Sequence, residues 1–351
     1  MDFYLDIRTV SLTKDQFLRA QAQLKADLNQ VRSQIDGLRA QGLGIVFDRA
    51  ARFVNPYEDL GPKTAPRCGT REPSSTTAHP STTTSHPSTT TSSRAFFKLY
   101  EILHRYRLLQ AAVAARGQLQ TLHLCEAPGS FVEATLDFVA RHWSACPVKW
   151  YGVTLKTGLS WKAVPTASDH VIYADVIHDA LPPHVQNSDL VTGDGGVEIE
   201  AQERNRQEQQ HGPLLRAQVQ QALWALRPQG HMVIKMFDLF EYETCEWLWY
   251  CYGQFDKVYL IKPFGSRICN SEKYVVGVRR KVVEPALADQ PIPAWFYGRV
   301  WTINQHFVTS QKKALAEAIR LTQTQPNPHT WDARAKLNPT QECLRWLGLL
   351  E

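Results

Sequence analysis

The 351-residue sequence predicts an α/β fold built on a doubly wound parallel sheet. Between residues 94 and 280, apolar runs of strand length alternate with segments whose apolar residues recur at helical spacing. Such alternation is typical of a parallel sheet that helices cover on both faces. A helical segment precedes this region and a mainly helical segment follows it. We therefore expect one large domain with an extension at each end.

The N-terminal extension, residues 1–47, is predicted to contain one long helix. The run Thr13-Lys14-Asp15-Gln16 has the form of a capping box, and apolar residues then recur at intervals of three, four and seven as far as Leu38. Gly42 and Gly44 mark the end of this helix. Its apolar seam is short for a coiled coil and contains Gln21, which favours packing on the protein's own domain. Binding of a protein partner through this helix is the alternative.

Residues 73–93 form a low-complexity segment of Ser, Thr, His and Pro with an imperfect seven-residue repeat. Almost none of these side chains can be buried, so ordering the segment would cost conformational entropy without return. We predict a disordered insertion in a surface loop of a domain that spans residues 48–280.

The other elements are predicted from periodicity and turn residues. Predicted strands lie at 121–125, 148–155, 171–174, 188–193, 230–236, 257–262 and 274–278, and predicted helices at 95–115, 130–141, 214–225 and 243–253. The C-terminal extension, residues 281–351, is predicted to contain helices near 309–321 and 340–350, the second after the start signal Asn338-Pro339.

Composition limits the class of protein. The net charge of +5 permits a nucleic-acid partner without requiring one. The seven cysteines include no C-x-x-C pair and no zinc-like cluster with histidine, so we expect no metal site and a reducing, intracellular setting. No apolar run approaches the roughly 18 residues that span a bilayer, and we expect no membrane association.

The turn after the first predicted strand is a candidate binding loop. In TLHLCEAPGSFVEATL, Glu126 ends the strand, and Ala127, Pro128 and Gly129 precede a helix that begins near Ser130. A dinucleotide site would need a glycine-rich fingerprint, and Glu126 would repel phosphate. A ligand that carries a cation, such as an amino-acid-like or sulfonium compound, fits better. An ordinary strand-to-helix turn is the alternative.

Three further ionisable residues lie at or just beyond the ends of predicted strands, where a doubly wound sheet binds its ligands. They are Asp194 in DLVTGDGG, Lys235 in GHMVIKMFD and Glu272 in SRICNSEKYVVG. Asp194 could instead form a turn, and Glu272 could be a surface charge. Lys235 lies among apolar residues, so its ammonium group needs a cavity or an anionic partner.

With Lys98 in SRAFFKLYEI, these residues occur in the order Lys, Asp, Lys, Glu, which resembles that of the FtsJ-type ribose 2'-O-methyltransferases. Within that family the sequence is most similar to the cap-specific mRNA methyltransferases of eukaryotes and large viruses. The resemblance covers roughly residues 48–280. It rests on the motifs NPYE, LCEAPGSF, VTLK, VTGDGG and IKMF, and on KP, SR and NSEKYVV between residues 262 and 276.

The resemblance implies a Rossmann-like fold of the S-adenosylmethionine-dependent methyltransferase type, with S-adenosyl-L-methionine as the cofactor. It implies catalytic roles for Lys98, Asp194, Lys235 and Glu272, with Lys235 as the general base. A lysine can deprotonate a ribose hydroxyl only if burial and a neighbouring cation lower its pKa, so the two lysines form a suitable pair. The two acids would orient both ammonium groups.

The resemblance also implies the cofactor contacts. The second strand ends in Thr154-Leu155-Lys156, without the acid that many such sites use for ribose hydroxyls, and Asp175 either faces the adenine or is a loop aspartate. The expected cofactor-binding residues are Glu126, Ala127, Pro128, Gly129, Ser130, Phe131, Thr154, Asp175 and Asp194.

The implied substrate is RNA, 5'-capped mRNA in particular, methylated at its first or second transcribed nucleotide. The alternatives are methylation of ribosomal or transfer RNA and a noncatalytic RNA- or cap-binding subunit. The expected compartment is the nucleus or the cytoplasm, that of a host cell if the source is viral. Phosphate contacts are expected from basic residues at two rims of the site, and base stacking from three aromatic residues. These residues are Arg49, Arg52, Lys63, Arg67, Arg71, Arg267, Lys273, Arg279, Arg280 and Lys281, and Tyr57, Phe96 and Phe264.

Overall fold

The structure is a computed structural model that describes residues 2–5, 10–60, 93–156, 161, 168–197, 206–282, 290–328, 331 and 339–349. The predicted insertion lies outside the described residues except for Ser93, which caps the helix that follows it. Three of the predicted RNA contacts, Lys63, Arg67 and Arg71, also lie outside them.

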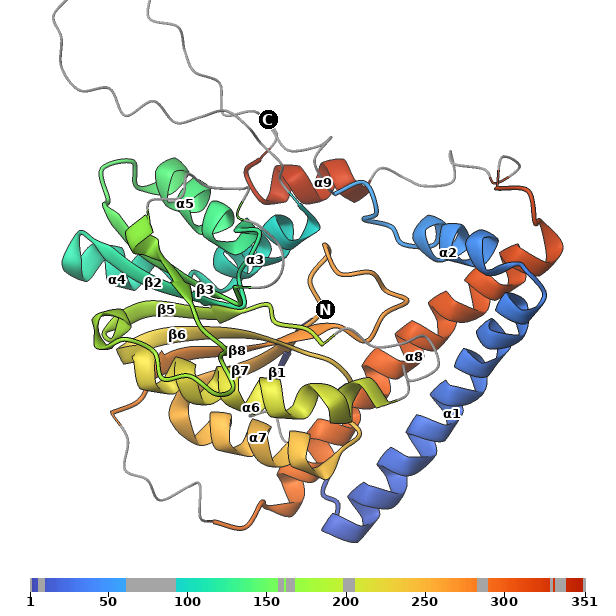
Figure 1. The fold of residues 1–351 in the computed structure, drawn as a ribbon. Helices are drawn as coiled ribbons and strands as arrows, with labels where there is room; N and C mark the ends of the chain where they lie inside the picture. The colour runs from blue at the N-terminus through green and yellow to red at the C-terminus, as the bar shows by residue number, and fades with distance from the viewer. Residues whose placement is uncertain are drawn as a thin grey trace, which may run out of the picture.

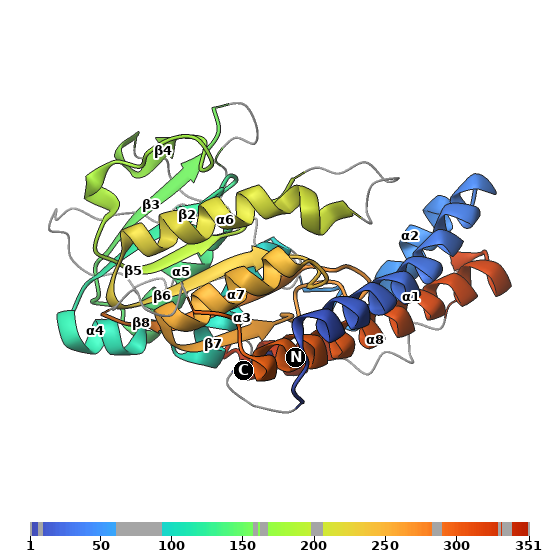
Figure 2. The same ribbon diagram turned by 90° about the horizontal axis from the view of Figure 1, so that it is seen from below.

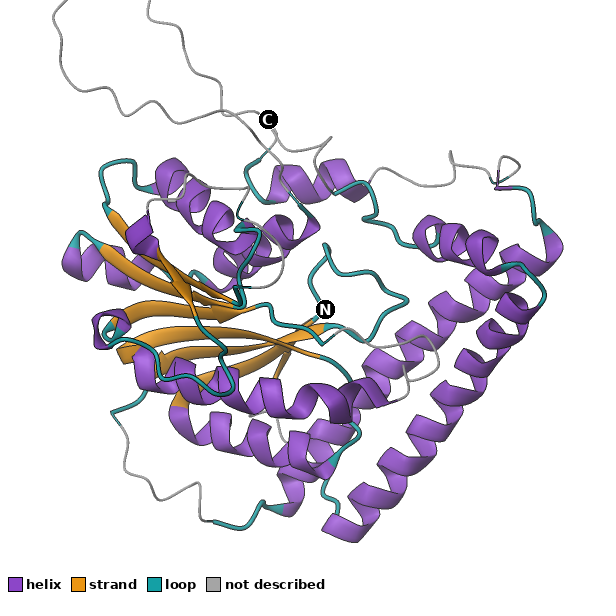
Figure 3. Ribbon diagram, in the orientation of Figure 1, coloured by secondary structure: helices purple, strands orange, loops and turns teal. Residues whose placement is uncertain are grey.

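The described strands form one sheet in the order β1-β7-β8-β6-β5-β2-β3-β4 (Figure 3). The strands are β1 (Asp2–Tyr4), β2 (Leu119–Leu124), β3 (Val148–Thr154), β4 (Val171–Tyr173), β5 (Ser188–Gly193), β6 (Leu226–Met236), β7 (Phe255–Ile261) and β8 (Lys273–Arg280). Strands β2 to β6 are parallel, and the chain runs outward from β2 to β4 before it returns to β5 on the other side of β2. The switch point of the sheet therefore lies between β2 and β5.

The sheet is mixed, which corrects the expectation of a parallel sheet. Strand β8 is antiparallel to both β6 and β7, and β1, absent from the predicted elements, pairs antiparallel with β7. Residues 262–272, which join β7 to β8, contain no crossover helix, so the chain can only turn back beside β7. This reversal brings the start of β8 to the same edge as the end of β6.

Helices cover both faces of the sheet (Figure 1). Helices α3 (Arg94–Tyr106), α4 (Gln110–Arg116) and α5 (Ser130–His142) lie on one face, and α6 (Gln207–Ala225) and α7 (Tyr242–Gln254) on the other. Neighbouring strand residues point to opposite faces, so Leu190 packs in the core with α3 and α5 while Val191 packs in the core with α6 and α7. The predicted helix 95–115 is two helices, because Arg107 adopts a left-handed conformation with φ 51° and ends α3.

The terminal helices form an arm that projects from the sheet (Figure 2). Helix α1 (Lys14–Ala40) packs along α8 (Ala294–Thr324), with α2 (Gly44–Phe53) against both. The capping box at Thr13 is confirmed, and the predicted packing of α1 on its own chain is confirmed too. Gln21 is buried there and donates to the carbonyl of Leu239 at 2.8 Å. No helix of the described residues is long and apolar enough to cross a membrane.

Helix α9 (Pro339–Trp346) ends the described chain and packs on the α3 side of the sheet. Cys343, Leu344 and Leu347 join the core that contains α3 and α5. The predicted helices of the C-terminal extension are therefore present, although the first is much longer than expected. Strand β1 and helix α9, near the two ends of the described chain, thus both pack on the sheet, whereas the helices of the arm project from it (Figure 2).

Candidate active site

Four charged residues meet at the carboxyl edge of the sheet. Lys98 lies on α3, Asp194 follows β5, Lys235 is near the end of β6, and Glu272 precedes β8. Their side chains are largely buried, with exposed fractions between 11% and 19%. The structure therefore brings together the four residues that the sequence analysis predicted as a group.

Lys235 is paired with Asp194. The Lys235 Nζ lies 3.3 Å from Asp194 Oδ1, and the same oxygen accepts a hydrogen bond of 2.6 Å from the hydroxyl of Tyr274. Tyr274 is the cross-strand partner of Lys235 in the β6–β8 register and is fully buried. Sequence reasoning missed Tyr274, because only the antiparallel register of β8 places it beside Lys235.

Lys98 is paired with Glu272. The Lys98 Nζ lies 2.7 Å from Glu272 Oε1, which also accepts a hydrogen bond of 2.7 Å from the hydroxyl of Ser266. Burial alone would lower the pKa of Lys98, but the carboxylates of Glu272 and Asp194 raise it above its ordinary value. Lys98 is an ammonium group at neutral pH.

The two ion pairs form one electrostatic group. Burial opposes ionisation of Glu272, but Lys98 and then Lys235 hold the pKa of its carboxyl well below the usual range. The carboxylate of Asp194 likewise stabilises the charged form of Lys98 and so raises its pKa. Two cations and two anions thus alternate around one small volume, so no buried charge lacks a counter-ion.

The loop before β8 is held in shape by Lys262. Its Nζ donates to the side-chain and main-chain oxygens of Asn270 and to the carbonyl of Glu272, each at 2.8 Å. Burial, with the nearby charge of Lys273, lowers the pKa of Lys262 to about 7. Lys262 therefore positions the backbone of Glu272.

Glu58, the last residue of the NPYE motif, joins this loop to the start of α3. Its carboxylate accepts from Arg94 at 2.9 Å and from Arg267 at 2.7 Å. Arg94 also donates to the carbonyl of Gly265 at 2.7 Å, and a Cβ at Gly265 would lie 3.0 Å from Lys98 Cγ. Gly265 thus allows the loop to approach Lys98 closely.

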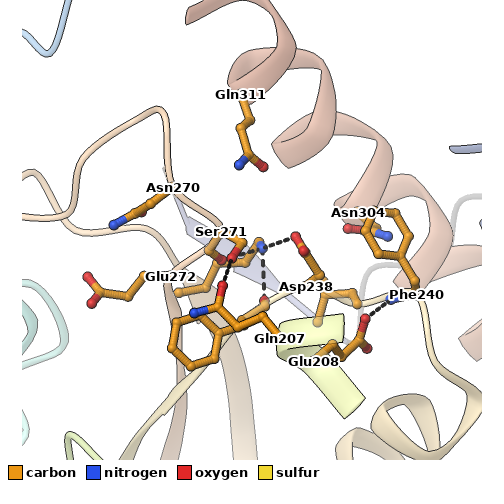
Figure 4. Close-up of polar contacts among 12 residues, drawn as sticks. Gln207, Glu208, Asp238, Phe240, Asn270, Ser271, Glu272, Asn304 and Gln311 are labelled. Carbon is orange, nitrogen blue, oxygen red and sulfur yellow. Dashed lines mark hydrogen bonds and ion pairs between the residues drawn. The ribbon is translucent and has the colours of Figure 1, made fainter. Parts of the chain in front are cut away.

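Lys273 is buried next to the charged group and does not reach the surface. Its expected role as a phosphate contact is therefore wrong. It is 2% exposed, and its Nζ donates to the carbonyls of Phe237 and Ser271 and lies 3.8 Å from Asp238. The hydroxyl of Ser271 in turn donates to Gln207 (Figure 4). These contacts join the segment after Lys235 to the segment before β8.

The helical arm reaches the same two segments. Arg32 on α1 donates to Asp238 at 3.0 Å, and Gln311 on α8 donates to the carbonyl of Cys269 at 3.0 Å. The arm therefore restrains both loops that carry the charged group. Helix α6 adds a further restraint, because Glu208 accepts from the backbone N–H of Phe240 at 2.9 Å (Figure 4).

The predicted binding loop lies at the switch point, but Glu126 has a structural task there. Its Oε1 accepts from the backbone N–H groups of Phe131 at 2.7 Å and Val132 at 3.0 Å and so caps α5. Both of these N–H groups therefore already have an acceptor within the protein. The Phe131 side chain is 1% exposed, in the core. Burial raises the pKa of Glu126 to about 8, although these two hydrogen bonds oppose the shift.

The other predicted cofactor residues surround this turn. Gly129 adopts φ 105°, which favours glycine, and its N–H donates to the carbonyl of Glu126, closing the turn at Ala127 and Pro128. Ser130 accepts from the hydroxyl of Ser93 at 2.7 Å, which ties α5 to the first turn of α3. Their cofactor contacts stay predictions.

Thr154 and Asp175 lie at the ends of β3 and β4. The carbonyl of Thr154 accepts from the N–H of Ala174, so Asp175 begins just beyond the paired strands. Asp175 Oδ1 accepts from the N–H of Ile177 at 2.9 Å, which shows the turn-forming role that was the alternative for this residue. Contact with an adenine stays a prediction.

Acidic residues from three strand ends lie near Cys125, the residue before Glu126. Burial raises the pKa of Cys125 to about 12, the ammonium group of Lys235 opposes this shift, and Asp194, Asp175 and Glu126 add to it. The expected preference of this edge for a ligand that carries a cation stays a prediction.

The glycines around Asp194 fix its position. The N–H of Gly195 donates to Gln218 Oε1 on α6 at 3.2 Å. A Cβ at Gly193 would lie 2.4 Å from the same oxygen, and one at Gly195 would lie 2.8 Å from Cys125 Sγ. Only glycine fits both positions, so VTGDGG places Asp194 through close packing. Gln218 was not identified from the sequence, because it lies in the middle of a helix without a motif.

Several expected RNA contacts lie elsewhere. Arg279 and Arg280 end β8 and Lys281 follows them, about 20 Å from Lys273 at the usual rise per residue. Arg279 pairs there with Asp256 at 2.9 Å. These three residues belong to the opposite edge of the sheet, because β8 runs antiparallel to β6. Their expected place at the rim of the site is wrong.

The remaining rim residues are near the site or exposed. Arg49 and Arg52 are exposed on α2, and Arg267 is paired with Glu58. The rings of Tyr57 and Phe264 lie 4.5 Å apart and tilted by 33°. Phe96, in contrast, is 4% exposed in the core, so it cannot stack on a base.

The raised pKa of Glu126 predicts a pH-dependent stability. The folded protein keeps the proton up to pH about 8, whereas the unfolded chain loses it near pH about 4.5. The stabilisation is complete below the lower value and is lost as the pH rises through the window. Glu126→Gln keeps the acceptor oxygen but cannot ionise. We expect its free energy of unfolding to rise relative to the wild type by at most about 1.4 kcal/mol per pH unit between pH 5 and 8.

Urea unfolding at pH 5 and at pH 8 measures the difference in free energy of unfolding between Glu126→Gln and the wild type. Glu246→Gln, at an exposed position of α7, is the control and should show no such change. Parallel pH profiles of the wild type and Glu126→Gln would contradict the assignment.

The comparisons with known proteins agree with this geometry. Residues 91–280 match the family described as FtsJ-like methyltransferase. A Danio rerio cap-specific mRNA (nucleoside-2'-O-)-methyltransferase 2 is 31% identical over 206 residues, which cover 52% of this chain and 28% of that protein. The cap-specific mRNA (nucleoside-2'-O-)-methyltransferase of Autographa californica nuclear polyhedrosis virus is 34% identical over 179 residues, 47% of this chain and 65% of the viral one. The chain thus spans less than two thirds of both relatives.

Proposed function

Because the chain belongs to the FtsJ-like methyltransferase family, we propose that it is an RNA 2'-O-ribose methyltransferase that uses S-adenosyl-L-methionine. The proposed substrate is 5'-capped mRNA, methylated at the first or second transcribed nucleotide. The observation that carries the proposal is the group of Lys98, Asp194, Lys235 and Glu272 at the carboxyl edge of the sheet. The names of the relatives support capped mRNA as the substrate class.

Lys235 is the general base. Its Nζ is held by Asp194, which Tyr274 fixes from the other side, so the amine has one orientation. A ribose hydroxyl is a weak nucleophile until its proton is removed, and Lys235 accepts that proton. Gly196 keeps the approach open, since a Cβ there would lie 3.3 Å from the Lys235 Nζ.

Lys98 has a different role, because its raised pKa keeps it protonated. It contributes a fixed positive charge to the charged group, balanced by the carboxylates of Glu272 and Asp194. Glu272 and Ser266 hold Lys98 in place. The two lysines therefore divide the work: one accepts the proton and the other supplies fixed charge.

The cofactor is held at the switch point. Glu126, Ala127, Pro128, Gly129, Ser130, Phe131, Thr154, Asp175 and Asp194 would hold it, and the carboxylates of Asp175 and Asp194 would fit its positive charge. The sulfonium group supplies a methyl group that can be transferred directly to an oxygen nucleophile. Alignment of the hydroxyl is then the main task of the protein.

RNA approaches over the rim of the site. Arg49 and Arg52 on α2 provide phosphate contacts, and the ring pair Tyr57 and Phe264 provides a surface for a base. Action on mRNA caps puts the protein in the nucleus or the cytoplasm, that of a host cell if the source is viral.

Methyl transfer to matched RNAs tests the proposal. The purified chain, labelled S-adenosylmethionine and one RNA sequence with and without a cap are combined, and mass spectrometry locates the label. We expect a 2'-O-methyl group at the first or second nucleotide of the capped RNA only. Equal transfer to uncapped RNA would favour the ribosomal or transfer RNA alternative. A preparation that binds the cofactor but methylates no RNA would refute the enzyme activity.

A further inference from the structure

A pocket of about 490 Å³ lies where α9 meets the C-terminal ends of α3 and α5. It is separate from the charged group, because Lys98 is near the start of α3 and the pocket is near its end. His104, on the wall of the pocket, is about 9 Å further along the helix axis than Lys98 at 1.5 Å per residue. No residue of the proposed mechanism lines it.

Flat rings form much of the pocket wall. On α5, the rings of Phe138 and His142 are stacked with centroids 4.2 Å apart, and Trp143 follows. On α9, Trp346 is 43% exposed, although tryptophan buries a large apolar area when it is covered. Its ring meets His104 edge to face at 4.9 Å. The pocket thus offers aromatic surface from two separate helices.

The charge of the pocket is positive. Arg105 lies 5.0 Å from the ring centroid of Trp346, and Arg107 is exposed at the end of α3. Among the described residues that line the pocket, none is acidic. Burial and then the positive groups of His142, Arg107 and Arg105 lower the pKa of His104, which reflects how closely these groups gather. An anion is therefore attracted here, and a cationic ligand is repelled.

We propose that this pocket binds a nucleotide, with its base stacked on the exposed ring of Trp346 and its phosphate at Arg107. Aromatic surface accepts any base, and a guanidinium group at the rim accepts the phosphate. A nucleotide of a bound RNA strand and a free mononucleotide share this chemistry. The RNA source rests on the proposed function.

The contacts around Trp346 favour the RNA source. Its ring lies 6.0 Å from that of Phe264, which in turn lies beside Tyr57 at the rim of the site. Arg105 lies beside both rings, 5.0 Å from the Trp346 centroid and 5.4 Å from the Phe264 centroid. Aromatic and cationic groups thus continue from the charged group to the pocket, so a strand that leaves the site meets them in turn.

Binding of labelled single-stranded RNA to the full chain, measured by fluorescence anisotropy, tests the pocket. Trp346→Ala should weaken binding of long oligonucleotides about tenfold, because stacking on one ring is worth about 1–3 kcal/mol. Trp224→Ala is the matched control, since Trp224 is 40% exposed on α6 at the other face of the sheet. It should bind RNA as the wild type does.

Arg107→Asn provides a second variant that leaves the packing intact. Arg107 has φ 51°, and asparagine tolerates this conformation. Loss of one phosphate contact should reduce the slope of log K against log salt by about 0.7. The same change with labelled mononucleotide would assign the free ligand, and an effect confined to long RNA would assign the RNA strand.

The proposal is overturned if both variants bind RNA and mononucleotides with wild-type affinity and salt dependence. The readout is binding and needs no methyl transfer. A chain that binds RNA through Trp346 and Arg107 but transfers no methyl group would refute the proposed function and leave the pocket assignment standing.

Discussion

Replacement of Lys235 with alanine is expected to lower kcat for methyl transfer about 10²- to 10⁴-fold, the contribution typical of a positioned general base. Asp194 would keep the hydrogen bond from Tyr274, so the edge should stay ordered. Cofactor affinity, measured by calorimetry, should change little, because the other acids at the switch point remain. A noncatalytic RNA-binding subunit would keep its biological activity in this variant.

Lys235→Arg separates charge from proton transfer. Arginine keeps the ion pair with Asp194 but cannot lose its proton near neutral pH, so we expect it to be as inactive as alanine. Lys149→Ala, at an exposed lysine on strand β3, is the control and should retain full kcat. An active Lys235→Arg enzyme would contradict the role of Lys235 as the base.

Replacement of Asp189 with alanine is expected to reduce the free energy of unfolding by about 3–5 kcal/mol, as for other broken buried ion pairs. Asp189 is at the opposite end of β5 from Asp194 and is fully buried. Its carboxylate accepts from Arg116 at 2.9 Å, from the N–H of Gln120 at 2.8 Å and from Arg227. Its removal leaves two arginines without their shared counter-ion.

Denaturant unfolding measures this loss. Asp256→Ala is the matched control, because Asp256 pairs with Arg279 at the surface, where the aspartate and arginine side chains are 35% and 44% exposed. We expect that change to cost about 1 kcal/mol or less. Folded Asp189→Ala should still bind the cofactor normally. Equal destabilisation by the two variants would show that the buried network contributes no more than a surface pair.

The sequence was most informative about the charged residues at the ends of strands, where the candidate active site lies. The alternation of apolar runs fixed which residues end strands, and the order Lys, Asp, Lys, Glu identified the charged group before its geometry was known. The four residues form two pairs, with charged atoms 2.7 Å and 3.3 Å apart, and the family resemblance had implied that they act as one group. The glycines of VTGDGG were also recognised as part of a motif. The structure explains why glycine is needed there, because a side chain at Gly193 or Gly195 would collide with Gln218 or Cys125.

The failures have a common origin in contacts between distant segments. The basic residues at 279–281 were expected near the site because they follow Glu272 closely, but the direction of β8 carries them to the opposite edge. Lys273 was expected to contact phosphate, but it lies buried beside Asp238, which is far from it in the sequence. The division into domains and the cofactor contacts stay predictions.

Glu272 and Lys273 show the limit most clearly. The sequence by itself determined that two charged neighbours precede a buried strand. Only the tertiary structure decided that Glu272 pairs with Lys98 while Lys273 is buried beside Asp238. Periodicity is local and shows that adjacent side chains point apart. Which of them meets the active site depends on where α3 and the segment after β6 dock, and that is set by packing across the whole sheet.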